Sequence, residues 1–171
     1  MIDNTAFKKE LEERVKEINA GIAGYLPEEK GCQKTIFEAM NYSMNAGGKR
    51  LRPLLMQEVC RLFTGEVSEI VKPFMAAIEM IHTSSLVHDD LPCKDDDMIR
   101  RGKASTWAEY GEDIGVLAGD ALMMYAFETA SKAFDAAEDA DALLRAGKAM
   151  GILAAKTGVY GMIGGQTGDV E

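Results

Sequence analysis

The sequence predicts an all-α protein of one domain. Apolar residues recur at helical spacing along much of the chain, which is the pattern of amphipathic helices. Only 4 prolines occur among 171 residues, and Ala, Met, Leu and Glu, which favour helices, are plentiful. Alternating apolar and polar runs are absent, so we expect no β-strand. The length is sufficient for a single domain with a sizeable core.

The first half of the chain divides into four expected helices. We place them over residues 5–22, 33–46, 53–63 and 69–91. Gly47 and Gly48 end the second helix, because glycine is favoured just after a helix. Pro53 suits the first turn of the third helix, whose apolar positions are Leu55, Val59, Leu62 and Phe63. The fourth helix is nearly all apolar and stops at Pro92.

Two more helices are expected in the second half, over residues 112–134 and 142–163. Residues 98–111 read as a connecting segment. Gly115 and Gly119 allow other elements to approach the fifth helix closely, and Asp120 stands among apolar neighbours there. A buried aspartate needs a partner or an ion. The sixth helix is rich in small residues, and the polar stretch GGQTGDVE follows it.

The overall composition excludes several classes of protein. A net charge of −9 argues against binding to nucleic acid or to anionic membrane surfaces. Three cysteines without a CxxC pair fit free thiols in a reducing cytoplasm. The amino terminus has no apolar signal core, and no stretch reaches membrane-spanning length. These features predict a cytoplasmic protein.

An aspartate-rich stretch, HDDLPCKDDDMIRRG, occupies residues 88–102 and contains the strongest chemical signal. Its aspartates repel one another and favour cations, and carboxylate oxygens are suitable ligands for Mg²⁺. Arg100 and Arg101 follow, with donors suited to phosphate oxygens. Acidic runs are usually solvated loops. Here the run follows residues 74–87, in which Glu79 is the only charged residue, so we expect a metal–diphosphate site.

A second stretch with a chemical signal is the basic segment GGKRLRP, residues 47–53. Lys49, Arg50 and Arg52 stand where a helix begins, although the positive end of the helix dipole disfavours cations there. An anion held by these side chains and the free amides would remove the conflict. The alternative is an ordinary helix start with solvated charges.

Three polar residues of the fourth helix share one face. His82, Ser85 and Asp89 lie at positions i, i+3 and i+7. A lone histidine such as His82 is more often a groove or core residue than a ligand, and we expect His88 to be structural.

Four motifs, in this order and spacing, resemble those of the trans-prenyltransferases, the polyprenyl (farnesyl and geranylgeranyl) diphosphate synthases. They are GGKRLRP, HTSSLVHDDLPCKDDDMIRRG, LAGDAL and GGQTGD. The resemblance implies an isoprenoid-synthase-type bundle of antiparallel helices around a central cavity, incomplete in this chain. It also implies condensation of isopentenyl diphosphate with an allylic diphosphate (dimethylallyl, geranyl or farnesyl), giving a C15–C20 product.

The resemblance assigns roles residue by residue. Asp89, Asp90 and Asp95 match the ligands of Mg²⁺ (Mn²⁺ is possible), and Arg100 matches the contact to the allylic diphosphate. The remaining implied substrate contacts are Lys49, Arg52, His82 and Arg101 for isopentenyl diphosphate, and Gln166 and Asp169 for the allylic pocket. Ser84 and Ser85 match the positions that gate product length, and the small Ser84 favours a product of twenty carbons or more. For Asp120 we expect a structural role.

The chain departs from the family pattern in three places, one of which is Trp107, where a smaller or polar residue is common. Lys94 stands within the metal motif where relatives often have methionine, so its ammonium is expected to weaken metal binding slightly or to pair with an aspartate. The family's second aspartate-rich motif, with its preceding lysine–threonine pair, is absent. We therefore expect residues 1–171 to be the amino-terminal part of a single prenyltransferase domain with little activity alone.

Three alternatives to the catalytic fragment stay open at this point. A noncatalytic or regulatory subunit would associate with a complete synthase. A metal phosphohydrolase would need more histidine ligands than the 2 present. A helical domain with a merely solvated acidic loop is the simplest alternative. The resemblance further suggests a homodimer formed through the fifth and sixth helices.

Overall fold

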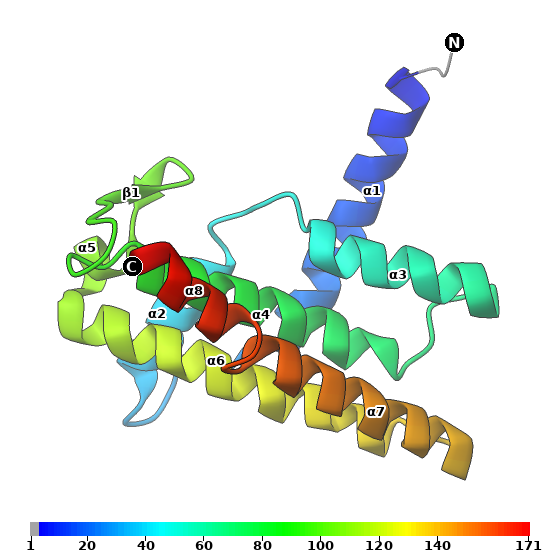
Figure 1. Ribbon diagram of the computed structural model, residues 1–171. Helices are drawn as coiled ribbons and strands as arrows, with labels where there is room; N and C mark the ends of the chain where they lie inside the picture. The colour runs from blue at the N-terminus through cyan, green and yellow to red at the C-terminus, as the bar shows by residue number, and fades with distance from the viewer. Residues whose placement is uncertain (1–3) are drawn as a thin grey trace.

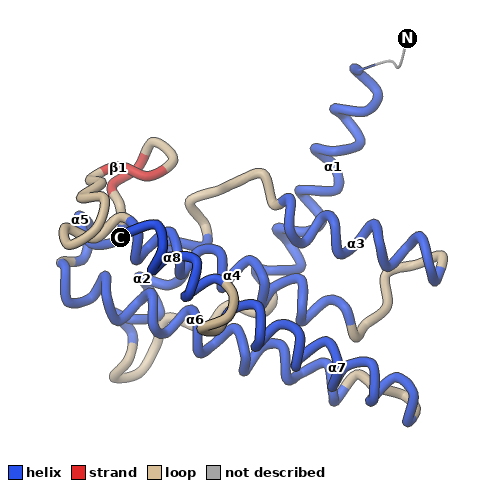
Figure 2. Tube along the Cα trace, in the orientation of Figure 1, coloured by secondary structure: helices blue, strands red, loops and turns tan. Residues whose placement is uncertain are grey.

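The computed structural model describes residues 4–171. The all-α prediction is confirmed (Figures 1 and 2). Residues 1–3, part of the stretch used above to exclude a signal sequence, lie outside the described residues. The helices are α1 (Asn4–Ala23), α2 (Lys34–Met44), α3 (Leu51–Thr64), α4 (Val71–Asp89), α5 (Thr106–Tyr110), α6 (Glu112–Asp135), α7 (Ala140–Thr157) and α8 (Met162–Val170).

Helices α4 and α6 form the centre of the bundle, and α4, α6 and α7 run antiparallel in turn (Figure 1). Helix α4 buries residues around most of its circumference, as its nearly all-apolar sequence predicts. Met80 on α4 and Leu122 on α6 are fully buried between the helices. Helix α1 projects from the bundle and buries only Ile18 and Ile22, near its carboxyl end.

Small residues on α6 let its neighbours approach closely. A Cβ atom on Gly119 would overlap the His88 imidazole, and one on Gly115 would lie 2.8 Å from the Cβ of Trp107. The expectation that these glycines allow close approach is confirmed. They fix the carboxyl end of α4, which carries the aspartate-rich stretch, against α6.

The connecting segment contains a short hairpin, so the expectation of no strand was wrong there. Strands β1 (Ile99–Arg100) and β2 (Lys103–Ala104) pair antiparallel. Arg101 and Gly102 form the two-residue turn with φ values of 54° and 78°. Positive φ at both central residues matches the right-handed twist of a hairpin. Strands of two residues are too short to show alternation in the sequence.

The carboxy-terminal part also differs from the expectation of one helix over residues 142–163 followed by a polar segment. Helix α7 ends at Thr157, and GGQTGDV lies within α8. A side chain on Gly161 would collide with the backbone of Lys156, so glycine permits this tight connection. Figure 1 shows α8 directed back toward α5 and the hairpin.

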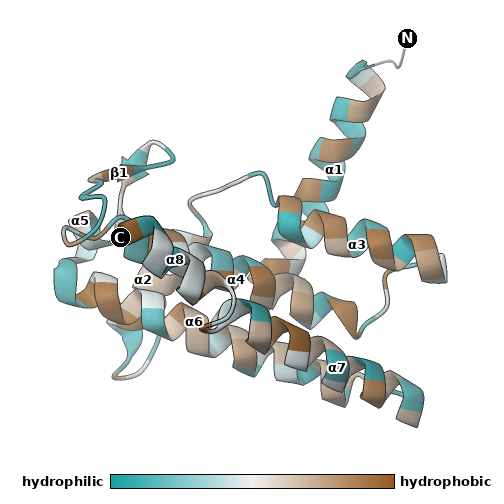
Figure 3. Cartoon of the chain, viewed as in Figure 1, coloured by the Kyte–Doolittle hydropathy of each residue, from teal (hydrophilic) through white to brown (hydrophobic). Residues whose placement is uncertain are grey.

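One face of α3 is apolar and exposed (Figure 3). It comprises Leu51, Leu55, Val59, Leu62 and Phe63, whose exposed fractions lie between 50% and 81%. The apolar positions named for this helix in the sequence therefore face outward. Burial of α3 instead involves Pro53 and Gln57.

Among residues 4–171, no helix is both long and apolar enough to cross a membrane.

Candidate functional site

The aspartate-rich loop folds back onto the carboxyl end of α4. The amide of Asp95 donates to the carbonyl of Asp89 at 3.0 Å, and the amide of Asp97 donates to the carbonyl of Asp90 at 3.1 Å. Asp96 has a φ of 52°, which reverses the chain direction locally. The loop thus gathers carboxylates at the negative end of a helix dipole, where cations are favoured.

Arg100 supplies one of these cations. Its Nε donates to Asp90 Oδ1 at 2.9 Å and to Oδ2 at 3.2 Å, its Nη2 also contacts Asp90, and Asp97 lies 3.3 Å away. The hydrogen bond to Asp90 raises the pKa of Arg100. Asp90 is buried, so its carboxylate is compensated chiefly by this fork. Two residues predicted to bind different parts of a metal–diphosphate ligand are here paired with each other.

Lys94 supplies a second cation. Its Nζ donates to Asp89 Oδ1 at 2.5 Å and to Gln166 Oε1 on α8, also at 2.5 Å. The expected pairing of Lys94 with an aspartate is confirmed. The same contact joins two motifs that are 72 residues apart in the sequence.

The donor chemistry of this loop fits Mg²⁺, although the loop does not form a complete cage. Within residues 4–171, no three His, Cys, Asp or Glu side chains converge closely enough to hold a metal ion by themselves. Magnesium is usually held by one or two carboxylates together with water and substrate phosphates. Asp89 and the exposed Asp95 offer such oxygens, so a phosphate-bearing ligand would complete the coordination.

Beside the loop lies a basic pocket of about 460 Å³ between the start of α3, the middle of α4 and the hairpin. The structure brings together here the four residues matched to the isopentenyl diphosphate site. They are Lys49, Arg52, His82 and Arg101. Arg101 donates to the carbonyl of Gly47, and a Cβ on Gly48 would lie 2.8 Å from its Nη1. Glycine at position 48 therefore leaves room for this guanidinium.

Arg50 has a different role from the one expected. Its Nη1 donates to Glu79 Oε1 at 2.8 Å, its Nε to Asn19 Oδ1 at 2.8 Å and its Nη2 to the carbonyl of Met44 at 2.6 Å. Only 4% of the residue is exposed. The left-handed backbone at Arg50, with φ at 49°, precedes α3 and accompanies this inward side chain. Arg50 thus braces the pocket whose lining it belongs to, and its donors are engaged within the protein.

A second cavity, of about 530 Å³, lies on the other side of Arg52 and His82. Ser85, Asp89 and Gln166 also line it, so the predicted common face of α4 does open into one space. The apolar part of the wall consists of Ile78, Ile81, Leu86, Leu153 and Met162, and Lys156 and Thr157 add polar groups. The basic pocket and this partly apolar cavity therefore share two side chains, and of the predicted metal ligands only Asp89 lines the cavity.

Ser84 and Asp169 line neither cavity, as is also the case for Asp90, Asp95 and Arg100 of the loop. Ser84 is fully buried and lines neither cavity, whereas Ser85 faces the second one. Asp169 is exposed on α8 and is not part of either lining. Asp120, expected to be buried, has a side chain that is 64% exposed and lies 3.5 Å from His88 Nε2. His88 packs against α6, as expected for a structural residue.

Burial and charge both act on His82. Burial lowers its pKa, and the neighbouring cations Arg52, Arg101 and Arg50 lower it further, against an opposing effect of Glu79. The imidazole is therefore mainly neutral near pH 7. A bound anion would reverse the effect of the arginines and favour the protonated form.

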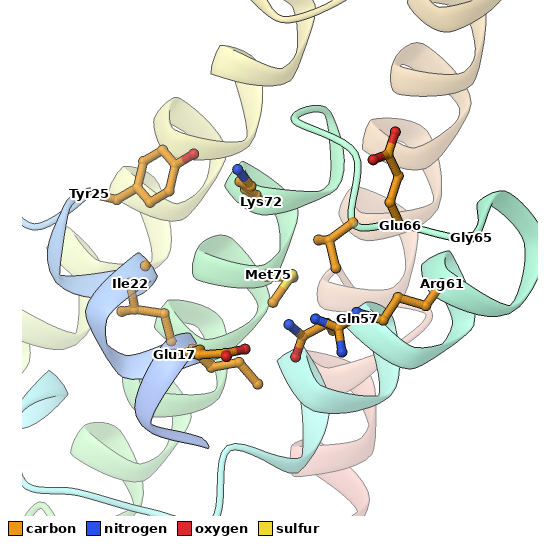
Figure 4. A pocket seen from close by; sticks show the side chains of 12 residues that line it. Glu17, Ile22, Tyr25, Gln57, Arg61, Gly65, Glu66, Lys72 and Met75 are labelled. Carbon is orange, nitrogen blue, oxygen red and sulfur yellow. The ribbon is translucent and has the colours of Figure 1, made fainter. Parts of the chain in front are cut away.

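Two hollows of the surface contain none of the predicted substrate or metal residues. An apolar groove of about 870 Å³ between α3, α4 and α7 shares Ile78, Leu153 and Lys156 with the second cavity. A separate cavity of about 630 Å³ lies between α1, α3 and α4 (Figure 4). Its polar groups come from Glu17, Tyr25, Gln57, Arg61, Glu66 and Lys72. Sequence analysis gave no signal for either, because their linings come from residues that form no motif.

Comparison with known proteins explains the arrangement of motifs. The model of the polyprenyl synthetase family matches residues 33–170. The chain belongs to this family. The large subunit 1 of a chloroplastic heterodimeric geranylgeranyl pyrophosphate synthase from Arabidopsis thaliana is 48% identical over 136 residues, which are 80% of this chain and 36% of that protein. A dimethylallyltranstransferase from Fischerella ambigua is 42% identical over 164 residues, covering 94% of this chain and 44% of that protein.

Solved structures of this family have the same fold. An FPP/GFPP synthase from Zymomonas mobilis superimposes with a TM-score of 0.86 at 37% identity, covering 97% of this chain and 58% of that one. A geranyltransferase from Legionella pneumophila gives 0.84 at 29% identity, covering 95% and 55%. The isoprenoid-synthase-type helical bundle is thereby confirmed. The chain spans less than half the length of the two curated relatives described above.

Proposed function

We propose that this chain provides the first part of the active site of a prenyltransferase that condenses isopentenyl diphosphate with an allylic diphosphate. One observation carries the proposal. The basic pocket and a second, partly apolar cavity, which Asp89 lines, share Arg52 and His82. Two diphosphates with apolar tails would thus be held side by side, each with its charged end near the shared wall.

The basic pocket would bind isopentenyl diphosphate. Lys49, Arg52 and Arg101 offer cationic donors, and His82 would add a proton-dependent one. Hydrogen bonds to charged groups are each worth about 1.5–3 kcal/mol. Since Arg50 neutralises Glu79 within the protein, the carboxylate in this pocket does not cancel the attraction for an anion.

The aspartate-rich loop would bind the allylic diphosphate together with Mg²⁺ or Mn²⁺. Asp89, Asp90 and Asp95 would contribute the oxygens, and Arg100 would contact the diphosphate after exchanging part of its hold on Asp90. The bound ion would neutralise charge on the leaving diphosphate as the allylic C–O bond ionises. Gln166 at the cavity wall and Asp169 on the same helix would face the allylic substrate when the site is complete.

The apolar cavity would protect the reactive cation from water. The aliphatic part of its wall comes from α4, α7 and α8 and continues into the groove along α3, and Lys156 and Thr157 interrupt it. Ser85 would limit the length of the growing prenyl chain. Ser84 lies behind it, buried in the helix interface. The small serines and the extended groove support a product of C15–C20, toward the longer end.

The proposal extends to the protein's organisation. We infer that residues 1–171 are the amino-terminal part of a single domain with little activity alone, which the greater length of the relatives and the exposed apolar face of α3 support. A cytoplasmic homodimer is the arrangement that we propose for the complete protein. A noncatalytic subunit is the second candidate, because one relative is named as the subunit of a heterodimeric synthase.

Calorimetric titration of the chain with isopentenyl diphosphate tests the basic pocket. We expect R52Q and R101Q each to weaken binding about tenfold or more, which corresponds to about 1.4 kcal/mol. R61Q is the matched control, because Arg61 lines the separate cavity between α1, α3 and α4. Equal affinities of R52Q, R101Q and R61Q would contradict the assignment. Condensation assays of the full-length protein with both substrates then decide between an enzyme and an accessory subunit.

A further inference from the structure

Lys94 stands between the proposed metal ligands Asp90 and Asp95, directly before Asp95. Its ammonium donates to Asp89 Oδ1 and Gln166 Oε1, both at 2.5 Å. Both side chains of the ion pair are sheltered, with exposed fractions of 24% for Lys94 and 22% for Asp89. The main chain at Lys94 is held as well, because the backbone amide of Lys94 donates to the carbonyl of Leu91 at 2.9 Å.

The two acceptors of this ammonium are themselves predicted ligand-binding groups. A carboxylate and an amide oxygen that converge on one point form a small cation-binding arrangement, and the side chain of Lys94 fills it. An ammonium is a compact point charge with three donors. While it is bound to Asp89, it neutralises the charge that would attract a divalent ion to this carboxylate.

The contact also joins two segments of the fold. Helix α8 has no buried residue, so apolar burial contributes little to its position. The hydrogen bond from Lys94 to Gln166 links α8 to the aspartate-rich loop across the second cavity. Loss of this bond would therefore loosen α8.

We propose that Lys94 is an internal counter-ion that competes with divalent ions for Asp89 and holds α8 over the cavity while no ion is bound. This inference rests on the proposed metal site. Lys94 yields Asp89 when a divalent ion binds, and its hydrogen bond to Gln166 is released at the same time. The chain then requires a higher ion concentration than it would with an uncharged residue at position 94.

Titration of the chain with Mn²⁺, followed by electron paramagnetic resonance in the presence of inorganic diphosphate, tests the competition. We expect K94M to bind Mn²⁺ about tenfold more tightly than the unmodified chain, equivalent to about 1.4 kcal/mol. K30M is the matched control: it removes the same charge from an exposed ion pair with Glu28, remote from the loop. K94Q should behave like K94M, and circular dichroism verifies that each variant is folded.

Hydrogen exchange gives the second measurement. We expect the amides of residues 162–170 to exchange faster in K94M, and to exchange faster in the unmodified chain when Mn²⁺ is added. Equal Mn²⁺ affinity in K94M, K94Q and K30M, with binding abolished by D89N, would overturn the role of Lys94 and leave the metal site intact. No Mn²⁺ binding in any of these proteins would overturn the metal site and the role of Lys94 together.

Discussion

The buried ion pair between Arg50 and Glu79, beside the basic pocket, allows a direct test of how much this pair stabilises the protein. Only 4% of the Arg50 side chain and 2% of the Glu79 side chain are exposed, and their atoms lie 2.8 Å apart. Substitution of Glu79 by Gln keeps the shape and leaves the guanidinium without a compensating charge. Removal of one partner of a buried pair costs about 3–5 kcal/mol, and we expect about 3 because Gln retains an acceptor.

Urea unfolding of the chain, followed by circular dichroism, measures this loss. With a slope of about 2 kcal/mol per M, the midpoint should fall by about 1.5 M. The double variant R50M/E79M removes both charges, and buried pairs replaced by apolar residues often lose little stability. We therefore expect the double variant to recover at least half of the stability that E79Q loses.

Two results would refute the reasoning. A loss below about 1 kcal/mol in E79Q would place the pair in the class of exposed ion pairs. A double variant less stable than E79Q would show that the contacts of Arg50 to Asn19 and Met44 matter more than the charge pair. E10Q is the control, because Glu10 pairs with Arg14 on the exposed surface of α1.

Three further predictions concern other parts of the site. In the complete enzyme, Ser85→Phe should shorten the main product relative to Ser85→Ala, as measured by chromatography of the dephosphorylated products; equal lengths would exclude Ser85 as a gate. Because the pKa of His82 is lowered from its ordinary value of 6.5, the unfolded chain binds this proton more readily, and stability should fall as pH drops through the interval below that value. His82→Gln should weaken this dependence of stability on pH, as measured by urea titrations at several pH values. An unchanged dependence would contradict the role assigned to His82. Gly119→Ala should cost about 1–3 kcal/mol in urea unfolding by overlap with His88, whereas Gly147→Ala, with open space around it, should be neutral or stabilising; similar effects of both would count against tight packing at Gly119.

Helix positions were predictable because the boundary residues act locally. Gly65 ends α3 with a φ of 82°, and Gly111 precedes α6 with a φ of 95°, both conformations that glycine adopts without strain. The hairpin at residues 99–104, the short helix α5 and the break before α8 were missed. These features depend on turns and short elements that carry too few residues for a periodic pattern.

The candidate site was predictable as a set of residues, and less so as a geometry. Three cations, Lys49, Arg50 and Arg52, look equivalent in the sequence. Arg50 turns inward because it pairs with Glu79, and this partner is 29 residues away in the sequence, so the local pattern does not reveal it. Asp120 has apolar neighbours in sequence and nevertheless faces outward. Such distinctions depend on which face of a helix meets the rest of the bundle, and a single sequence does not specify that for every residue.

The shared wall formed by Arg52 and His82 has a thermodynamic consequence. A guanidinium that donates to an anion in one compartment has fewer donors left for the other, and a histidine protonated by one ligand presents its charge to both. Occupancy of either compartment must therefore alter the affinity of the other by the same factor. Such linkage needs no movement of the helices, and it would make the affinity measured for either negatively charged ligand depend on the concentration of the other.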